Sequence, residues 1–203
     1  MSEQIRRKSK YLSWLLRHGA RETGLTMDAA GWAPVIEVLA TARMSRATLE
    51  AVVRDNNKNR LQLDGGRVRA SQGHSLDGTP VTLDALEASW DVWAGRGPLW
   101  HGTRIEVIES IARTGVRAQS RTHVHLADAL DSTVGKRANI AVMLQIDPAA
   151  LRAAGQEVYV SPNGVVLVRM VPPSCIVGLR AMTRRAKQQQ PALRAVMGLS
   201  APA

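Results

Sequence analysis

The chain of 203 residues lacks several features that would assign a protein to a class at once. Its single cysteine, Cys175, excludes an internal disulfide framework and any zinc or iron–sulfur site built from several cysteines. Phenylalanine is absent, and no run approaches the roughly 18 apolar residues that a membrane-spanning helix needs. The first ten residues are polar and basic, without the apolar segment of a secretory signal. We therefore expect a cytoplasmic protein with no membrane association.

Common nucleotide-binding and metal-binding signatures are also absent. The sequence contains no Walker phosphate-binding loop, no Gly-x-Gly-x-x-Gly after a predicted strand and no His-Glu-x-x-His. This argues against a P-loop NTPase, a Rossmann dehydrogenase and a zincin. His123 and His125 could share one face of a strand, but no third ligand stands out nearby, so we predict no metal site.

Acidic residues are scarce relative to basic ones. Lysine and arginine total 27 against 17 aspartate and glutamate residues, which gives a net charge of +10. Arginine outnumbers lysine 22 to 5. A GC-rich coding genome can produce this excess, but guanidinium is also the better planar, bidentate phosphate ligand. The charge favours nucleic acid or another polyanion as partner.

The charge divides the chain into blocks. Residues 1–75 and 96–203 carry net charges of +6 and +8, whereas residues 76–95 hold four acidic residues and no lysine or arginine. We therefore predict a first lobe over residues 1–75, an acidic linker over 76–97 and a second lobe over 98–182. Residues 183–203, rich in arginine and glutamine, are expected to form a loosely attached tail.

The first block is predicted to form three helices and a hairpin. The helices are expected over Lys8 to His18, with Gly19 at C′, over Pro34 to Ala42, and after Ser45 as N-cap. Alternation at Leu61, Leu63, Val68 and Ala70 around Asp64-Gly65-Gly66 predicts two strands and a tight turn. Three helices followed by a hairpin are typical of a winged helix, a fold that often binds nucleic acid but does not establish that function.

The second block is predicted to mix strands with helices, which makes the whole chain α+β. A helix is expected over Ile105 to Ile111, closed by Gly115, and a further helical stretch after a short strand at 123–126. Asn163-Gly164 indicates a type I′ hairpin turn. Strands are predicted at the following positions: 98–101, 123–126, 141–146, 157–160 and 165–168.

Arg17-His18 admits two interpretations. Cationic side chains at a helix C-terminus commonly interact with the negative end of the helix dipole. Alternatively, Arg17 and His18 begin an anion site, with Arg60, Arg69 and Arg121 as candidates to complete it. Periodicity and composition alone lead no further than a basic protein of two lobes with a candidate phosphate site.

Several short motifs, in their order and spacing, resemble the NAD-dependent RNA 2′-phosphotransferase family, known from tRNA splicing. They cover Lys8 to Ile176 and are Ser9-Lys10-Tyr11-Leu12-Ser13-Trp14-Leu15-Leu16-Arg17-His18, Gly31-Trp32, Asn59-Arg60-Leu61, Arg69-Ala70-Ser71-Gln72-Gly73-His74-Ser75, Leu99-Trp100-His101-Gly102-Thr103, Arg121-Thr122-His123-Val124-His125-Leu126, Val134-Gly135-Lys136-Arg137 and Ser161-Pro162-Asn163-Gly164-Val165.

The resemblance implies a winged-helix RNA lobe followed by an ADP-ribosyltransferase-like lobe. It also implies a reaction that consumes NAD⁺. The 2′-phosphate of an RNA attacks the nicotinamide ribose to give an RNA-2′-phospho-ADP-ribose intermediate and nicotinamide. The ribose 2″-hydroxyl then displaces the RNA, so that 2′-hydroxyl RNA and ADP-ribose 1″,2″-cyclic phosphate are released. RNA bearing a 2′-phosphate is the implied partner, and no obligate protein partner is implied.

Site residues carry over from the family motif by motif. The catalytic tetrad corresponds to Arg17, His18, Arg60 and Arg121, with Arg69 as the competing choice for Arg60. The expected contacts to NAD⁺ are made by His101, Gly102, Thr103, His125 and Val165. Further contacts to the RNA substrate are expected from Arg69, His74 and His123.

Three other functions remain open at this stage. The protein could ADP-ribosylate phosphorylated RNA or DNA ends and stop after the first step, or it could be a winged-helix protein that binds nucleic acid without catalysis. It could also modify proteins. Val165 argues against that last function, because protein-modifying relatives often carry a glutamate at its position.

Overall fold

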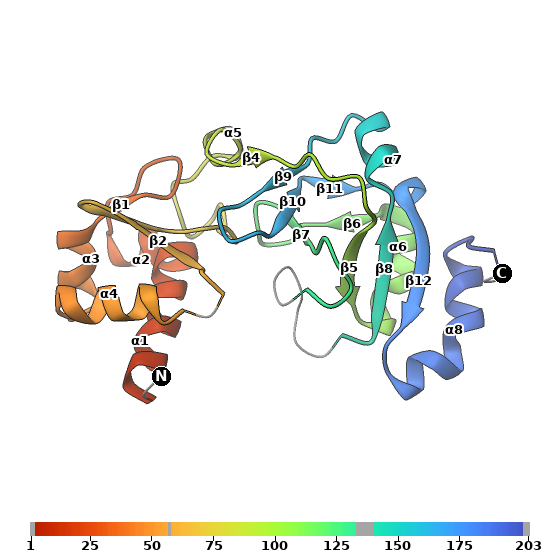
Figure 1. The fold of residues 1–203 in the computed structure, drawn as a ribbon, viewed down its shortest axis with the longest axis horizontal. Helices are drawn as coiled ribbons and strands as arrows, with labels where there is room; N and C mark the ends of the chain where they lie inside the picture. Colours follow the sequence, from red (N-terminus) through yellow and green to blue (C-terminus); the bar gives the residue numbers. More distant parts are fainter. Residues whose placement is uncertain (1–2, 57, 133–139, 201–203) are drawn as a thin grey trace. The chain divides into compact units, whose positions relative to one another are not determined.

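The computed structural model describes residues 3–56, 58–132 and 140–200. The motif Val134-Gly135-Lys136-Arg137 lies outside these residues. Helices alternate with antiparallel sheets along the chain, which confirms the α+β class (Figure 1). The chain divides into two compact units. The first consists of Met1–Asp91, Gln119–Thr122 and Ser161–Asn163, and the second of Val92–Ala118, His123–Val160 and Gly164–Ala203.

The first unit packs short helices against a small sheet. Its helices are α1 (Glu3–Trp14), a π-helical turn (Leu15–Gly19), α2 (Ala20–Thr23), α3 (Val35–Thr41), α4 (Arg46–Arg54) and α5 (Leu83–Glu87). The strands β1 (Ala33–Pro34), β2 (Leu61–Asp64) and β3 (Arg67–Ala70) form an antiparallel sheet in the order β1-β3-β2. Leu12, Leu16, Leu49 and Val68 are fully buried, so one apolar face of the first helix supplies much of this core.

The first helix does not end where the sequence predicts. Gly19 was expected at C′, but its φ is −105° and the helical path continues to Thr23. Gly24, with φ of +67°, terminates it and donates its N–H to the carbonyls of Ala20 and Arg21. Gly19 has a different constraint, because a Cβ there would lie 2.7 Å from the Trp14 ring. The glycine permits close packing inside the helix rather than its termination.

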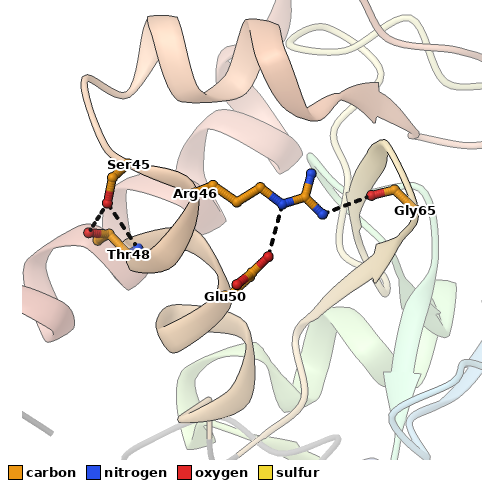
Figure 2. Close-up of polar contacts among 5 residues, drawn as sticks. All are labelled: Ser45, Arg46, Thr48, Glu50 and Gly65. Carbon is orange, nitrogen blue, oxygen red and sulfur yellow. Dashed lines mark hydrogen bonds and ion pairs between the residues drawn. The ribbon is translucent and has the colours of Figure 1, made fainter.

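The third helix and the hairpin are confirmed. Ser45 is the N-cap of α4 and its hydroxyl accepts the N–H of Thr48, as Figure 2 shows. Strands β2 and β3 pair from Leu61↔Ala70 to Asp64↔Arg67 around Gly65-Gly66. Arg46 ties the two elements together, since it contacts Glu50 on α4 and donates to the Gly65 carbonyl of the turn (Figure 2).

The second unit is built on three antiparallel sheets. Its strands are β4 (Asp91–Val92, at the boundary between the units), β5 (Leu99–Thr103), β6 (Val116–Arg117), β7 (Val124–Leu126), β8 (Val142–Ile146), β9 (Tyr159–Val160), β10 (Val166–Val168), β11 (Met170–Val171) and β12 (Ile176–Ala181). The sheet orders are β12-β8-β5, β4-β9-β10-β7 and β11-β6. Helices α6 (Ile108–Thr114) and α7 (Pro148–Ala153) accompany them. Leu99, Leu126, Leu144 and Val166 are buried in one core that joins β5, β7, β8 and β10.

Two predictions in this unit are corrected. Asn163-Gly164 was expected to form a type I′ turn, which needs positive φ at both residues. Gly164 has φ of +76°, but Asn163 does not have a positive φ, and five residues separate β9 from β10. The Asn163 side chain bonds Ser161 and Lys58, which fixes a longer loop. Residues 128–131 form bends and turns, not the helix expected after residue 126, and the continuation of that stretch over 133–139 lies outside the described residues.

The last segment, expected as a loosely attached tail, contains helix α8 (Arg184–Val196). Thr183 caps it, and Ala186 and Leu193 are buried in the core of the second unit. Two apolar residues seven positions apart lie on the same helical face and attach the helix to β12 and α6. No helix within the described ranges is long and apolar enough to cross a bilayer.

Candidate functional site

Arg17 lies in the π-helical turn that follows α1, and its guanidinium points into the protein. Its Nε and Nη2 atoms are buried and have no hydrogen-bond partner among the described residues. Burial, and then the nearby positive charges of Arg60 and Arg121, lower the pKa of Arg17 to about 10. A buried guanidinium with unpaired donors and two cationic neighbours is suited to accept an anion of matching geometry.

His18 is held by Ser75, a residue that the sequence analysis did not select although it ends the Gly73-His74-Ser75 motif. The His18 Nδ1 lies 3.1 Å from the Ser75 Oγ. The backbone N–H and hydroxyl of Ser75 both donate to the Arg17 carbonyl, at 2.9 and 3.3 Å. Because the hydroxyl proton is directed to that carbonyl, its oxygen is left to accept from His18 Nδ1–H. This arrangement leaves Nε2 as the nitrogen that gains or releases a proton.

The pKa of His18 is lowered from its ordinary value, first by burial and then by the charges of Arg17 and Arg121. The neutral imidazole is therefore favoured while no anion is bound. A phosphate dianion beside the same group acts in the opposite direction, since negative charge favours the imidazolium. His18 is thus placed to change its protonation when an anion arrives.

Arg60 belongs to a loop that is fixed by three side chains. Asn56 Oδ1 accepts the N–H groups of Lys58 and Arg60, at 3.2 and 3.4 Å. The Ser71 hydroxyl donates to the Asn59 carbonyl at 2.9 Å. From a distant part of the chain, Asn163 Nδ2 donates to the Lys58 carbonyl at 2.9 Å. A loop held at three points presents Arg60 to Arg17 in a defined position.

Arg121 lies in the short segment 119–122 that belongs to the first unit. The segment is attached there by the Thr122 N–H, which donates to the His74 carbonyl at 3.0 Å. Its charge reaches both Arg17 and His18, since it lowers the pKa of each. The structure therefore brings together the four residues that the resemblance placed in a tetrad, from three separate segments of the chain.

Arg69, the competing choice for Arg60, has other partners. Its Nε donates to Gln62 at 2.7 Å, and its Nη1 donates to the Ser89 hydroxyl at 2.8 Å. The guanidinium carbon also lies 4.6 Å from the centre of the Trp32 ring. Arg69 is not among the leading causes of the lowered pKa of Arg17 or of His18. The geometry favours Arg60 at the site and gives Arg69 a structural role in β3.

The two histidines predicted to contact RNA are buried. His74 is fully inaccessible, and a Cβ at Gly31 would lie 2.7 Å from its Nε2. His123 is 1% exposed and directly precedes β7. The structure uses the His74 backbone to attach segment 119–122, so His74 supports Arg121 from the interior. It does not bring His74 or His123 to an open surface.

The residues predicted to contact NAD⁺ gather on two neighbouring strands of the second unit. His101, Gly102 and Thr103 follow one another on β5, and Trp100 pairs with Ala127 just beyond β7. The His101 Nδ1 lies 3.1 Å from the His125 carbonyl, which fixes one ring nitrogen. Val165 is buried and directly precedes β10, the strand paired with β7. A Cβ at Gly102 would lie 2.5 Å from the Ile140 side chain, so the strand is closely approached there.

The protein is strongly basic and α+β, and it surrounds the buried, unpaired guanidinium of Arg17 with Arg60, Arg121 and His18. This arrangement of donors suits a phosphate group. Residues 3–170 match the sequence profile of the RNA 2′-phosphotransferase, Tpt1/KptA family. The chain belongs to this family, which confirms the resemblance.

Curated relatives agree with that assignment. A probable RNA 2′-phosphotransferase of Pseudomonas fluorescens is 37% identical over 84% of this chain and 95% of its own length. One from Pseudomonas syringae is 39% identical over 81% of this chain and 89% of its own length. One from Streptomyces griseus is 39% identical over 81% and 92%, respectively. The similarity therefore covers both units and nearly the whole of each relative.

Proposed function

We propose that this protein transfers an internal RNA 2′-phosphate to NAD⁺, yielding 2′-hydroxyl RNA, ADP-ribose 1″,2″-cyclic phosphate and nicotinamide. The observation that carries the proposal is the state of Arg17, whose buried Nε and Nη2 atoms have no partner among the described residues while Arg60 and Arg121 lie nearby. Membership of the RNA 2′-phosphotransferase family supplies the nature of the anion.

The three arginines would bind the 2′-phosphate and orient it. Before binding, their like charges destabilise one another in a partly desolvated site, as the lowered pKa of Arg17 indicates. A phosphate dianion removes this repulsion and accepts bonds from the fixed donors. Charge-assisted hydrogen bonds of this kind contribute roughly 1.5–3 kcal/mol each. The same donors would stabilise the charge that develops when the RNA oxygen departs.

His18 would supply the proton for the departing RNA 2′-oxygen. Ser75 fixes its Nδ1, so Nε2 is the atom that carries the transferable proton. The phosphate raises the pKa of the imidazole on binding, which loads that nitrogen when substrate is present. General acid catalysis by a positioned histidine typically contributes 10²–10⁴-fold.

The second unit would bind NAD⁺, which when bound supplies the ribose that receives the phosphate. The polar groups present fit such a ligand, because His101, Thr103 and His125 offer side chains on adjacent strands and the Nδ1 of His101 is already engaged. Gly102 and Val165 complete the proposed contacts. Val165 carries no carboxylate, and none is needed to activate a nucleophile that is already an anionic phosphate. We further propose that the first unit is a winged helix and the second an ADP-ribosyltransferase-like lobe.

The test is an incubation of the purified protein with a short RNA that carries one internal 2′-phosphate, with and without NAD⁺. We expect NAD⁺-dependent formation of 2′-hydroxyl RNA, ADP-ribose 1″,2″-cyclic phosphate and nicotinamide. Arg121→Ala, folded but inactive, is the matched control. Accumulation of an ADP-ribosylated RNA would instead show an enzyme that stops after the first step. Binding of RNA without any nicotinamide release would refute the catalytic proposal.

A further inference from the structure

The first unit has a second basic region, distant from Arg17, in an open groove of about 800 Å³ between α1 and the end of α3. Its lining includes Arg7, Lys8 and Tyr11 from α1, and Arg43 directly after α3. Glu3 is the only acidic residue of the lining, and its carboxylate is paired with Arg6. The groove therefore combines an excess of positive charge with an aromatic ring, the combination that suits a single-stranded nucleic acid.

Arg43 occupies a backbone position that favours glycine. It is the residue after the C-cap of α3, with φ of +45°. The Arg43 N–H donates to Ala40 and the Met44 N–H donates to Leu39, which is the Schellman arrangement in which C′ is left-handed and usually glycine. A non-glycine residue there is strained. Retaining arginine despite this strain suggests that its side chain has a use.

Lys8, a third cation of the lining, links the two sides of the groove. Lys8 Nζ donates to the carbonyls of Ala42 and Arg43, at 3.0 and 3.1 Å, and so links α1 to the C-terminus of α3. The guanidinium groups of Arg7 and Arg43 have no hydrogen-bond or ion-pair partner within the described part of the chain. The guanidinium groups of Arg7 and Arg43 are thus available to a ligand, while Lys8 fixes the position of α1 against the end of α3.

We propose that this groove binds the RNA strand flanking the 2′-phosphate, with Arg7 and Arg43 contacting the sugar–phosphate backbone. Arg7 and Arg17 lie on one helical path, ten residues and so about 15 Å apart. An RNA strand that enters the groove from the proposed phosphate site must therefore extend a few nucleotides beyond the 2′-phosphate. The proposal rests on RNA being the substrate, and it assigns the α1–α3 groove a role in affinity for longer RNAs rather than in the chemical step.

Binding of fluorescent single-stranded RNA without a 2′-phosphate tests the proposal directly. In the absence of NAD⁺, we expect Arg7→Ala and Arg43→Gly each to weaken binding by up to about fivefold, the size typical of an exposed ion pair. The slope of log affinity against log salt should decrease by about 0.7 for each lost contact with a single strand. Arg54→Ala, which removes an exposed arginine of α4, is the matched control and should change neither quantity.

Arg43→Gly separates binding from folding. Glycine relieves the left-handed strain, so the variant should melt at the wild-type temperature or about 2–4 °C higher while binding RNA more weakly. A lowered melting temperature, or unchanged RNA affinity in both variants, would overturn the proposal.

Turnover provides a second arm. The double variant Arg7→Ala/Arg43→Gly should show a raised KM on a long 2′-phosphorylated RNA. Its kinetics should be unchanged on a short RNA that carries only the nucleotides next to the 2′-phosphate. An equal loss of kcat/KM on the long and the short RNA would also overturn the proposal. The binding arm uses neither NAD⁺ nor the 2′-phosphate, so a failure of the proposed reaction leaves its result interpretable.

Discussion

At the scale of single residues, Arg17 carries a positive charge where the folded protein disfavours it. Its pKa is lowered from the ordinary arginine value to about 10 by burial and by its arginine neighbours. Arg17→Met should therefore raise the free energy of unfolding by on the order of 2–3 kcal/mol, since each pKa unit corresponds to about 1.4 kcal/mol. The same variant should lose phosphate-dependent activity. Thermal denaturation measures the expected gain in stability and the turnover assay the expected loss of activity. A Met variant less stable than the wild type would contradict the prediction.

Arg60 and Arg69 are predicted to fail in different ways. Arg60→Ala should lower activity tenfold to a hundredfold or more with little change in stability, because it removes a donor to the phosphate. Arg69→Ala should instead destabilise the fold by about 1–3 kcal/mol, because it removes the bonds to Gln62 and Ser89. Urea denaturation and kcat/KM for both variants decide the matter. The opposite pattern would return Arg69 to the tetrad.

His18 predicts a pH dependence of stability with a definite sign. Its pKa in the folded protein lies below the value near 6.5 of the unfolded chain. The unfolded chain thus binds more protons as the pH falls below about 6.5, and stability decreases there. Above that pH both states are neutral at His18 and the residue contributes no pH dependence. His18→Asn, which keeps a donor to Ser75, should flatten the melting temperature in this window, and an unchanged acid slope would argue against the shift.

At the scale of elements, the loop that presents Arg60 depends on Asn163, a residue 105 positions from its partner Lys58. Asn163→Ala should reduce kcat/KM by about tenfold or more, chiefly through KM for the phosphorylated RNA, because Arg60 loses its fixed position. Asn163 acts through Arg60 and not on the substrate, so it is a positioning residue. Its effect should disappear in an Arg60→Ala background, and additive losses in the double variant would contradict this role.

Local patterns predicted the elements whose causes are local. The N-cap at Ser45 and the hairpin around Gly65-Gly66 depend on residues within a few positions, so the sequence contains their signals. The prediction that the first helix ends at Gly19 was wrong. The glycine makes room for the Trp14 ring, one turn earlier, and does not terminate the helix. The prediction of a type I′ turn at Asn163 was wrong because the Asn163 side chain bonds the carbonyl of Lys58, which is distant in the sequence.

The site shows the same division. The sequence offered Arg17 and His18 as the start of an anion site, with three arginines as candidates to complete it, and the family motifs then selected Arg60 and Arg121 from among them. The choice between Arg60 and Arg69 required their partners, which only the folded chain provides. Ser75 was missed because a serine beside a histidine in sequence gives no sign of bonding a different histidine 57 positions away.

At the scale of the whole molecule, each unit should respond to its own ligand. We expect 2′-phosphorylated RNA to slow amide hydrogen exchange in Leu15–Gly19 and Gln119–Thr122, and NAD⁺ to slow it in Leu99–Thr103 and Val124–Leu126. Each ligand is added alone, and an unphosphorylated RNA is the control for the first. Protection by NAD⁺ confined to the first unit would contradict the assignment of the NAD⁺ contacts.

The first unit is not a continuous stretch of chain, because Gln119–Thr122 and Ser161–Asn163 return to it after the second unit has begun. During synthesis, which proceeds from the N-terminus, Arg121 emerges only after the first segment of the second unit, Val92–Ala118, and Asn163 only after the second segment, His123–Val160. The proposed phosphate site therefore remains incomplete until part of the second unit has been synthesised. A gene fragment that ends at residue 91 would encode Arg17, His18 and Arg60 without Arg121. Recombination that transfers the proposed site intact must therefore carry part of the second unit with it.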